Sequence, residues 1–200
     1  MKTPTVVAIL LFDDVEVLDF AGPFEVFSVA AELLNDHREL RVVTVAESPG
    51  EIRAIGGLRI RPERTIAELT GPDVLVVPGG DGTRREMYNE SLLRWVTTVH
   101  GRASLTLSVC SGARLLARAG LLDGLRVTTH HQVLEHLREL APAAFVESNS
   151  RYIDAGRIVT TGGISAGIDG AFHVVARFWG EDAARATAAY MEYDRRGTSR

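Results

Sequence analysis

The segment Ser104-Leu-Thr-Leu-Ser-Val-Cys-Ser-Gly-Ala-Arg-Leu-Leu-Ala-Arg-Ala119 joins two unlike patterns at Cys110, the only cysteine of the sequence. Residues 104–109 have the pattern of a short buried strand, and the residues after Cys110 have the pattern of a starting helix. A thiol at a strand-to-helix turn faces free backbone N–H groups and the positive end of the helix dipole, which both favour the thiolate. The position therefore predicts a nucleophile, whereas the alternative is an inert cysteine in the core.

Strand and helix patterns alternate along the rest of the chain. Segments 5–12 and 73–77 are continuous apolar runs, which are typical of strands buried on both faces of a sheet. The remaining pattern predicts strands at 40–46, 144–146 and 157–161, a hairpin at 52–60, and helices at 24–34, 65–69, 90–99, 131–140, 166–179 and 181–190. This order predicts one α/β domain at residues 1–194, with a mainly parallel sheet sandwiched between helices, and a frayed tail at 195–200.

The composition narrows the classes of function. The chain has 200 residues and a formal net charge of −4, so we expect no nucleic-acid partner. One cysteine excludes an intrachain disulfide framework and a cysteine-cluster zinc site, and a reduced cytoplasmic setting fits best. We expect no signal peptide, and no apolar stretch approaches the roughly 20 residues of a membrane-spanning helix.

Chemically distinctive residues follow three of the predicted strands. Segment 13–23 contains four carboxylates, Pro78 is followed by Gly79 and Gly80, and Cys110 is followed by Ser111. If these strands are parallel neighbours, all three ends lie at one rim of the sheet, where α/β proteins bind their ligands. A thiol, a carboxylate and a glycine loop with free N–H groups are the parts of a nucleophilic site.

The residues alone leave the identity of the acid open. Glu16 and Asp19 are three positions apart, so a helical turn would place both on one side, and either could reach the thiol. Asp19 could instead cap the helix that is predicted to start near Pro23. His130 lies 20 residues after Cys110 and could supply an imidazole. Its neighbour His131 is adjacent in sequence, so the two side chains cannot both face the thiol. A metal site is not expected.

Taken together, these motifs resemble the ThiJ/PfpI superfamily, which has a flavodoxin-like fold. Within it the chain is most similar to the subgroup of isonitrile hydratases and of the sensor domains of AraC-type regulators. The resemblance rests on segments that span nearly the whole chain: 11–23, 75–80, 108–124, 128–130, 159–169, 178–181 and 190–193.

The resemblance implies roles for the residues at the rim. It assigns the catalytic carboxylate to Asp19, three residues before Gly22-Pro23, while Glu16 keeps the place of the acid found in other superfamily members. The backbone N–H groups of Gly80 and Ser111 would be the oxyanion donors, with Gly79 and His130 beside the substrate. The resemblance also implies a homodimer and no metal or organic cofactor.

The expected activity is the cysteine-dependent hydration of a small, mostly apolar isonitrile, or of a related carbon electrophile, to an N-substituted formamide. Proteases and glyoxalase-like members of the superfamily usually have histidine directly after the cysteine, and Ser111 at that place argues against both activities. The alternative is a stand-alone sensor of a ligand or of redox state that catalyses nothing. We expect no helix-turn-helix segment after residue 193, so such a sensor would need a partner.

Overall fold

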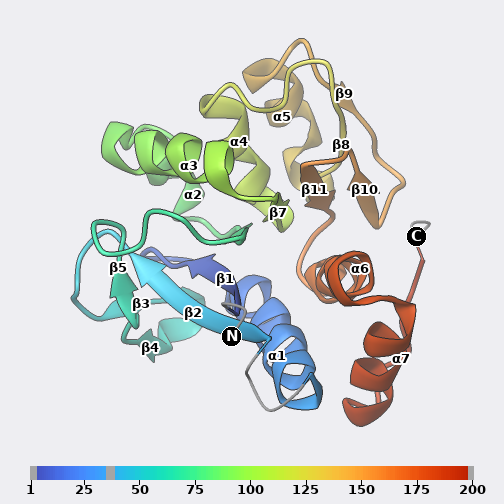
Figure 1. The fold of residues 1–200 in the computed structure, drawn as a ribbon. Helices are drawn as coiled ribbons and strands as arrows, with labels where there is room; N and C mark the ends of the chain where they lie inside the picture. The colour runs from blue at the N-terminus through green and yellow to red at the C-terminus, as the bar shows by residue number, and fades with distance from the viewer. Residues whose placement is uncertain (1–3, 35–38, 198–200) are drawn as a thin grey trace.

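The computed structural model describes residues 4–34 and 39–197. Within these ranges seven strands form one sheet in the order β10-β11-β7-β6-β1-β2-β5, and every neighbouring pair is parallel except β10 with β11 (Figure 1). The strands are β1 (Thr5–Leu10), β2 (Leu40–Ala46), β5 (Arg64–Thr65), β6 (Val74–Val77), β7 (Leu105–Ser108), β10 (Tyr152–Asp154) and β11 (Ile158–Thr161). Every residue of β6, β7 and β11 is buried, as their continuous apolar and small side chains predict.

Helices cover both faces of this sheet (Figure 1). On one face α1 (Val17–Leu33), α6 (Ala166–Trp179) and α7 (Glu181–Tyr190) pack against one another. On the other face α4 contacts each of its three neighbours; this layer consists of α2 (Thr83–Glu86), α3 (Glu90–Arg102), α4 (Ala113–Arg118) and α5 (Leu134–Leu140). The predicted α/β sandwich with a flavodoxin-like, mainly parallel sheet is therefore confirmed.

The strand order brings the chemically distinctive loops together. From β1 the chain crosses to β2 on one side and later returns to β6 on the other side of β1, so the order reverses between β1 and β6. The carboxyl ends of β1, β6 and β7 lie at the same rim, and an isolated bridge joins Val15 to Gly80 there. A reversal of this kind is where open α/β sheets form their ligand crevice.

Two short pairs of strands lie outside the main sheet, one antiparallel and one parallel. The predicted hairpin is present as β3 (Ile52–Arg53) and β4 (Arg59–Ile60), with Gly56 and Gly57 at positive φ in the turn. The strand predicted at 144–146 is present as β9 (Phe145–Val146), but it pairs with β8 (Arg126–Val127) and not with the main sheet. The antiparallel strand β10 was not predicted, because its three residues carry too short a pattern.

The first helix begins seven residues earlier than predicted. α1 starts at Val17, so Pro23 lies inside the helix and Asp19 in its first turn, whereas the sequence predicted a start near Pro23. Proline disfavours a helix interior through its missing N–H, but tertiary packing overrides that preference here. A Cβ on Gly22 would meet the Ile168 side chain at 2.8 Å, which shows how closely α1 and α6 pack.

The prediction of a short helix at 65–69 is wrong. Thr65 belongs to β5, and the Ile66 N–H donates to the carbonyl oxygen of Ala46 at 2.9 Å, which extends the pairing with β2. Both the N–H and the hydroxyl of Thr65 donate to the Glu68 carboxylate, at 2.8 and 3.0 Å. These side-chain contacts stabilise a turn in place of a helix.

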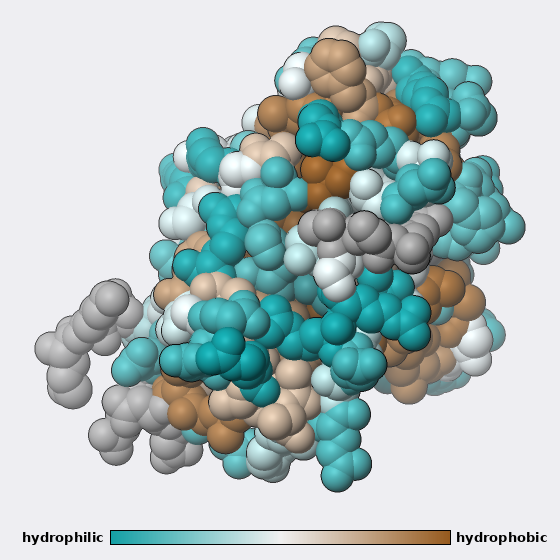
Figure 2. All heavy atoms as spheres, turned by 90° about the vertical axis from the view of Figure 1, so that its right-hand side faces the viewer, coloured by the Kyte–Doolittle hydropathy of each residue, from teal (hydrophilic) through white to brown (hydrophobic). Residues whose placement is uncertain are grey.

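The segment after α7 is tied to the domain where the structure describes it. Arg195 forms an ion pair with Glu181 at 2.6 Å, and the Arg196 N–H donates to Asp169 at 2.9 Å. Residues 198–200 of the tail predicted to fray lie outside the described residues. On the face drawn in Figure 2 hydrophilic side chains predominate and apolar ones form separate patches. Among the described helices none is long and apolar enough to cross a membrane.

Gly112 offers a test of the close packing between β6 and the turn after β7. A Cβ at this position would lie 2.1 Å from the carbonyl oxygen of Val77, so Gly112→Ala forces the backbone to move. We expect this substitution to lower the free energy of unfolding by about 2–3 kcal/mol in urea denaturation. Gly101→Ala is the control, because Gly101 lies in α3 with nothing near its Cβ position. We expect the control to raise stability by about 0.4–1 kcal/mol, and equal effects of the two substitutions would contradict the packing described.

Candidate active site

Cys110 stands directly at the end of β7 in a strained conformation. Its φ is +56°, a left-handed value that is costly for any residue other than glycine, and it opens a 3-10 turn that leads into α4. The backbone holds this conformation from both sides, because the Cys110 N–H donates to Gly162 and the Cys110 carbonyl accepts from the Thr129 hydroxyl at 2.6 Å. A strained, sharply turned residue of this kind presents its side chain at the top of the sheet.

Asp19 meets the thiol from the opposite layer of the molecule. Its side chain is fully buried, and Oδ2 accepts a hydrogen bond from the Gly79 N–H at 3.0 Å. Oδ1 is buried and has no hydrogen-bond partner among the described residues. The carboxyl interacts with the Cys110 thiol. The structure thus brings Asp19, and not only the glycine loop, to the cysteine.

Burial controls the protonation of this pair. Burial raises the pKa of the Asp19 carboxyl to about 7, and the negative charge of Glu16 adds to the rise. Burial, followed by the negative charge of Asp19, raises the pKa of the Cys110 thiol to about 12. The turn geometry at the rim had predicted a thiolate. The desolvation caused by burial outweighs the effect of the backbone N–H groups on the pKa of Cys110, so the resting thiol is neutral. A neutral thiol needs a base, and Asp19 is beside it.

Two backbone N–H groups of the glycine loop are already hydrogen-bonded at the rim. The Gly80 N–H donates to the Ser111 hydroxyl at 2.9 Å, and the Gly79 N–H donates to Asp19 at 3.0 Å. The Ser111 N–H interacts with the Cys110 sulfur. The assignment of Gly80 and Ser111 as oxyanion donors stays a prediction, in which an oxyanion would replace the Ser111 hydroxyl at the Gly80 N–H.

Ile164 contributes a donor that the sequence did not indicate. It follows β11, has a φ of +54°, and its backbone N–H interacts with both the Cys110 sulfur and the Asp19 carboxyl. A backbone group leaves little trace in a sequence. The only signal was the glycine pair Gly162-Gly163 before it, which marks a tight turn after a buried strand.

A pocket of about 330 Å³ opens onto the thiol. Five of the seven predicted site residues line it, whereas Asp19 and Gly79 are not among its lining residues. The lining residues combine a few apolar side chains with many polar ones: Glu16, Ile55, Gly80, Asp81, Arg84, Cys110, Ser111, Arg114, His130, Gln132, Val133 and Ile164. The pocket is thus more polar than the apolar isonitrile expected from the sequence would require.

His130 lines the same pocket in a fixed orientation. Its Nδ1 accepts a hydrogen bond from the Gln132 N–H at 3.3 Å, which caps the turn at the start of α5. A Cβ on Gly163 would meet the His130 ring at 2.0 Å, so the ring packs directly over that glycine. His130 therefore shapes the wall of the pocket, in the place expected for a substrate-contacting residue.

Arg114 is a charged wall residue that the sequence analysis overlooked. It lies in the first turns of α4, is only 4% exposed, and donates through Nη1 to the Thr83 hydroxyl at 3.0 Å. The signal was available, because Arg114 follows Cys110 by four residues and positions four apart share one side of a helix.

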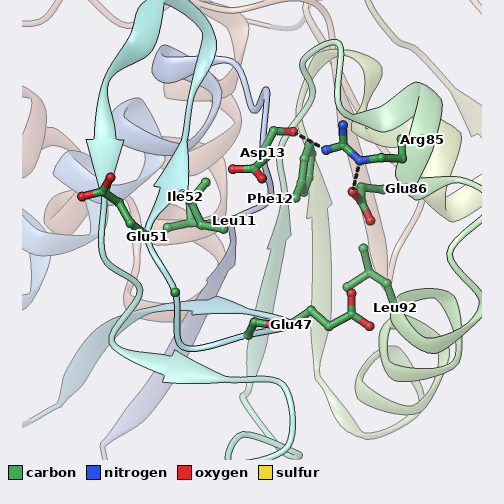
Figure 3. Close-up of a pocket in the computed structure, with 11 residues that line it drawn as sticks. Leu11, Phe12, Asp13, Glu47, Glu51, Ile52, Arg85, Glu86 and Leu92 are labelled. Carbon is green, nitrogen blue, oxygen red and sulfur yellow. Dashed lines mark hydrogen bonds and ion pairs between the residues drawn. The ribbon is translucent and has the colours of Figure 1, made fainter.

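A second, smaller pocket of about 220 Å³ lies apart from the cysteine, between the loop after β1, the β3 hairpin and α2 (Figure 3). Its one arginine, Arg85, already donates to the Asp13 carbonyl oxygen and to the Glu86 carboxylate. Among the described residues no group of histidine, cysteine, aspartate or glutamate is arranged to hold a metal ion. The reactive groups are therefore concentrated in the pocket at Cys110.

Several known proteins resemble this chain in sequence or in fold. The chain is 32% identical to an isonitrile hydratase of Pseudomonas putida over 94% of this chain and 78% of the hydratase. It is 29% identical to the HTH-type transcriptional regulator GbdR of Pseudomonas aeruginosa over 97% of this chain, which corresponds to 52% of the regulator. The crystal structure of a ThiJ/PfpI family protein from Pseudomonas syringae superposes with a TM-score of 0.86 at 27% identity, covering 97% of this chain and 77% of that one.

A model of the DJ-1/PfpI family matches residues 5–177, which include all three strand-end loops and the whole pocket wall. Because that match covers most of the sequence, and because the hydratase is 32% identical over 94% of this chain, this chain belongs to the DJ-1/PfpI family.

Proposed function

We propose that this protein is a cysteine-dependent hydratase that converts small isonitriles to N-substituted formamides. The observation that carries the proposal is the contact between the strained Cys110 thiol and the buried Asp19 carboxyl, at a pocket of small-molecule size. The likeness to an isonitrile hydratase over 94% of the chain supports the choice of substrate. Cys110 is the nucleophile, Asp19 is the acid/base, and neither step needs a metal or organic cofactor.

In the first step Asp19 accepts the proton of the Cys110 thiol while the sulfur attacks the terminal carbon of the isonitrile. The carboxyl then gives that proton to the same carbon, so the product is a thioimidate, R–N=CH–S–Cys. The N–H groups of Ser111 and Ile164 interact with the sulfur and stabilise its developing negative charge. The step needs no other proton source, because the proton that Asp19 takes from the Cys110 thiol is the one that it gives to the carbon.

In the second step water adds to the carbon of the thioimidate. The Asp19 carboxylate accepts one proton from the water and passes it to the nitrogen as the new C–O bond forms. When the adduct collapses, the C–S bond breaks, Asp19 transfers the remaining hydroxyl proton to the leaving sulfur, and R–NH–CHO is released. Glu16 lies at the pocket side of Asp19 and raises its pKa, which keeps the proton exchange close to neutral pH.

A sensor that binds a ligand without turnover is the second candidate. The likeness to the regulator GbdR over 97% of this chain favours it. A redox sensor fits less well, because burial raises the pKa of the Cys110 thiol to about 12 and peroxide reacts with the thiolate. Ligand binding that persists without Cys110, together with no turnover of isonitriles, would identify the sensor.

We also propose that the protein forms a homodimer, and we expect light scattering after gel filtration to give twice the chain mass of 21.7 kDa. Apolar side chains that favour association are exposed on α1, where Leu18 and Phe24 are 37% and 38% exposed. Phe24→Glu should therefore shift the mass towards one chain, whereas Glu25→Gln on the same helix should not. A monomeric wild-type protein would contradict the proposal.

The Cys110→Ala variant tests the nucleophile. We expect it to lose hydration of cyclohexyl isocyanide by roughly 10⁴-fold or more, since no other group can form the thioimidate. The conversion to N-cyclohexylformamide is measured as the loss of the isonitrile stretching band in the infrared spectrum. Ser108→Ala is the matched control on β7, because the Ser108 hydroxyl is buried with no hydrogen-bond partner among the described residues. Unchanged turnover by Cys110→Ala would refute the mechanism.

The pH profile tests Asp19. Because burial raises its pKa to about 7, Asp19 is protonated below that value and cannot accept the thiol proton. We expect kcat/KM to fall about tenfold per unit as pH decreases below 7, and to be level above it.

Two isosteric variants separate the candidate acids. Asp19→Asn should lower kcat/KM by about 10²–10⁴-fold and remove the acid limb of the profile. Glu16→Gln should keep most activity and shift the limb to lower pH, because Glu16 raises the pKa of Asp19. The reverse pattern would assign the acid role to Glu16.

A further inference from the structure

Arg114 is a buried cation that lacks a buried anion. The side chain is 4% exposed and lines the pocket at Cys110. Its Nε donates to Nδ1 of His136 at 3.2 Å and its Nη1 donates to the Thr83 hydroxyl at 3.0 Å, and neither acceptor is a carboxylate. In the part of the chain that the structure describes, Nη2 has no hydrogen-bond partner and the guanidinium forms no ion pair.

Two carboxylates, Glu16 and Asp81, line the same pocket but form no ion pair with Arg114. Asp81 pairs with Arg84 at 3.9 Å, and its negative charge also acts on Arg114. Burial, and after it the positive charge of Arg84, lowers the pKa of Arg114. Arg114 therefore shares its side of the pocket with a second guanidinium, and among the described residues no carboxylate is in direct contact with it.

An unpaired charge in a buried position is costly unless an anion neutralises it. Arginine binds carboxylates well, because its planar fork matches the two oxygens in a bidentate pair. The pocket of about 330 Å³ is large enough for a small molecule that reaches both the guanidinium and the thiol.

We propose that the pocket selects small electrophiles that carry a carboxylate, held by Arg114 with Arg84 at the rim, while the reacting carbon lies at Cys110. This substrate class rests on the proposed function for turnover, but binding of the carboxylate does not depend on it. Isocyanoacetate is thus a better substrate than the neutral isocyanoacetamide of similar size.

Alkylation of the thiol provides a test that needs no turnover. Cys110 is the only cysteine of the sequence, so mass spectrometry of the intact protein follows one reaction. The measured quantity is the ratio of the rate constants for iodoacetate and iodoacetamide, which differ in the carboxylate. Any effect of a substitution on the reactivity of the thiol itself changes both rates and cancels in the ratio.

We expect Arg114→Leu to lower the iodoacetate/iodoacetamide ratio by about tenfold, as the loss of a charge-assisted hydrogen bond implies. Arg114→Lys should give an intermediate ratio, because it retains the charge but loses the planar fork. Arg118→Leu is the matched control one turn later in α4, where the side chain is exposed and does not line the pocket. Its ratio should equal that of the wild type.

Arg84→Gln provides a second variant, because Arg84 is exposed and its replacement leaves the core intact even if Arg114→Leu does not fold. We expect its ratio to fall about two- to fivefold. Unchanged ratios in both variants would overturn the carboxylate site. If the ratio falls but no isonitrile is hydrated, the site stands and the proposed function fails. If isonitriles are hydrated with a ratio that is independent of Arg114, the function stands and the site fails.

Discussion

The hydrogen bond from the Gly79 N–H to the Asp19 carboxylate is the interaction on which the site depends. It joins the loop after β6 to the first turn of α1, and a Cβ on Gly79 would clash with both Asp19 Oδ2 and the Ser111 N–H at 2.7 and 2.6 Å. Three segments far apart in the sequence therefore meet around one residue that has no side chain. Because that contact fixes the carboxyl, the acid and the thiol hold their relation without help from substrate.

Burial gives this site its chemical character. The same desolvation that keeps the Cys110 thiol neutral also keeps the proton of Asp19 exchangeable near pH 7. A resting neutral thiol is protected from oxidation, while a neighbouring base can still activate it when an electrophile arrives. The thiol therefore stays protonated until an electrophile is bound and Asp19 removes its proton. This separates the chemistry proposed here from that of an exposed, acidic cysteine.

The sequence contained enough information for the central strands, for the helices other than α2, and for the meeting of the three loops, because long apolar runs and strand-end glycines indicate them directly. The short outer strands β5 and β10 were missed, since two or three residues carry too little pattern. α6 and α7 have the predicted bounds, since each has a clear periodic pattern. The start of α1 was missed because packing against α6 overrides the effect of Pro23. In the site, the residue pattern pointed to Cys110 and Ser111, whereas the choice of Asp19 over Glu16 came from the family resemblance. The engagement of the Gly80 N–H and the donor at Ile164 were not, since backbone groups carry no residue identity.

The edges of the sheet limit how copies of this chain can associate. The outer strands, β5 and β10, contain two and three residues. Strands this short present few unpaired backbone N–H and C=O groups, and short edge strands are a recognised protection against the edge-to-edge pairing of sheets. Growth of a continuous sheet across two chains is therefore disfavoured from either side. Association through side chains on the helices avoids this limit, and single substitutions there can tune it without disturbing the strand that leads to the thiol.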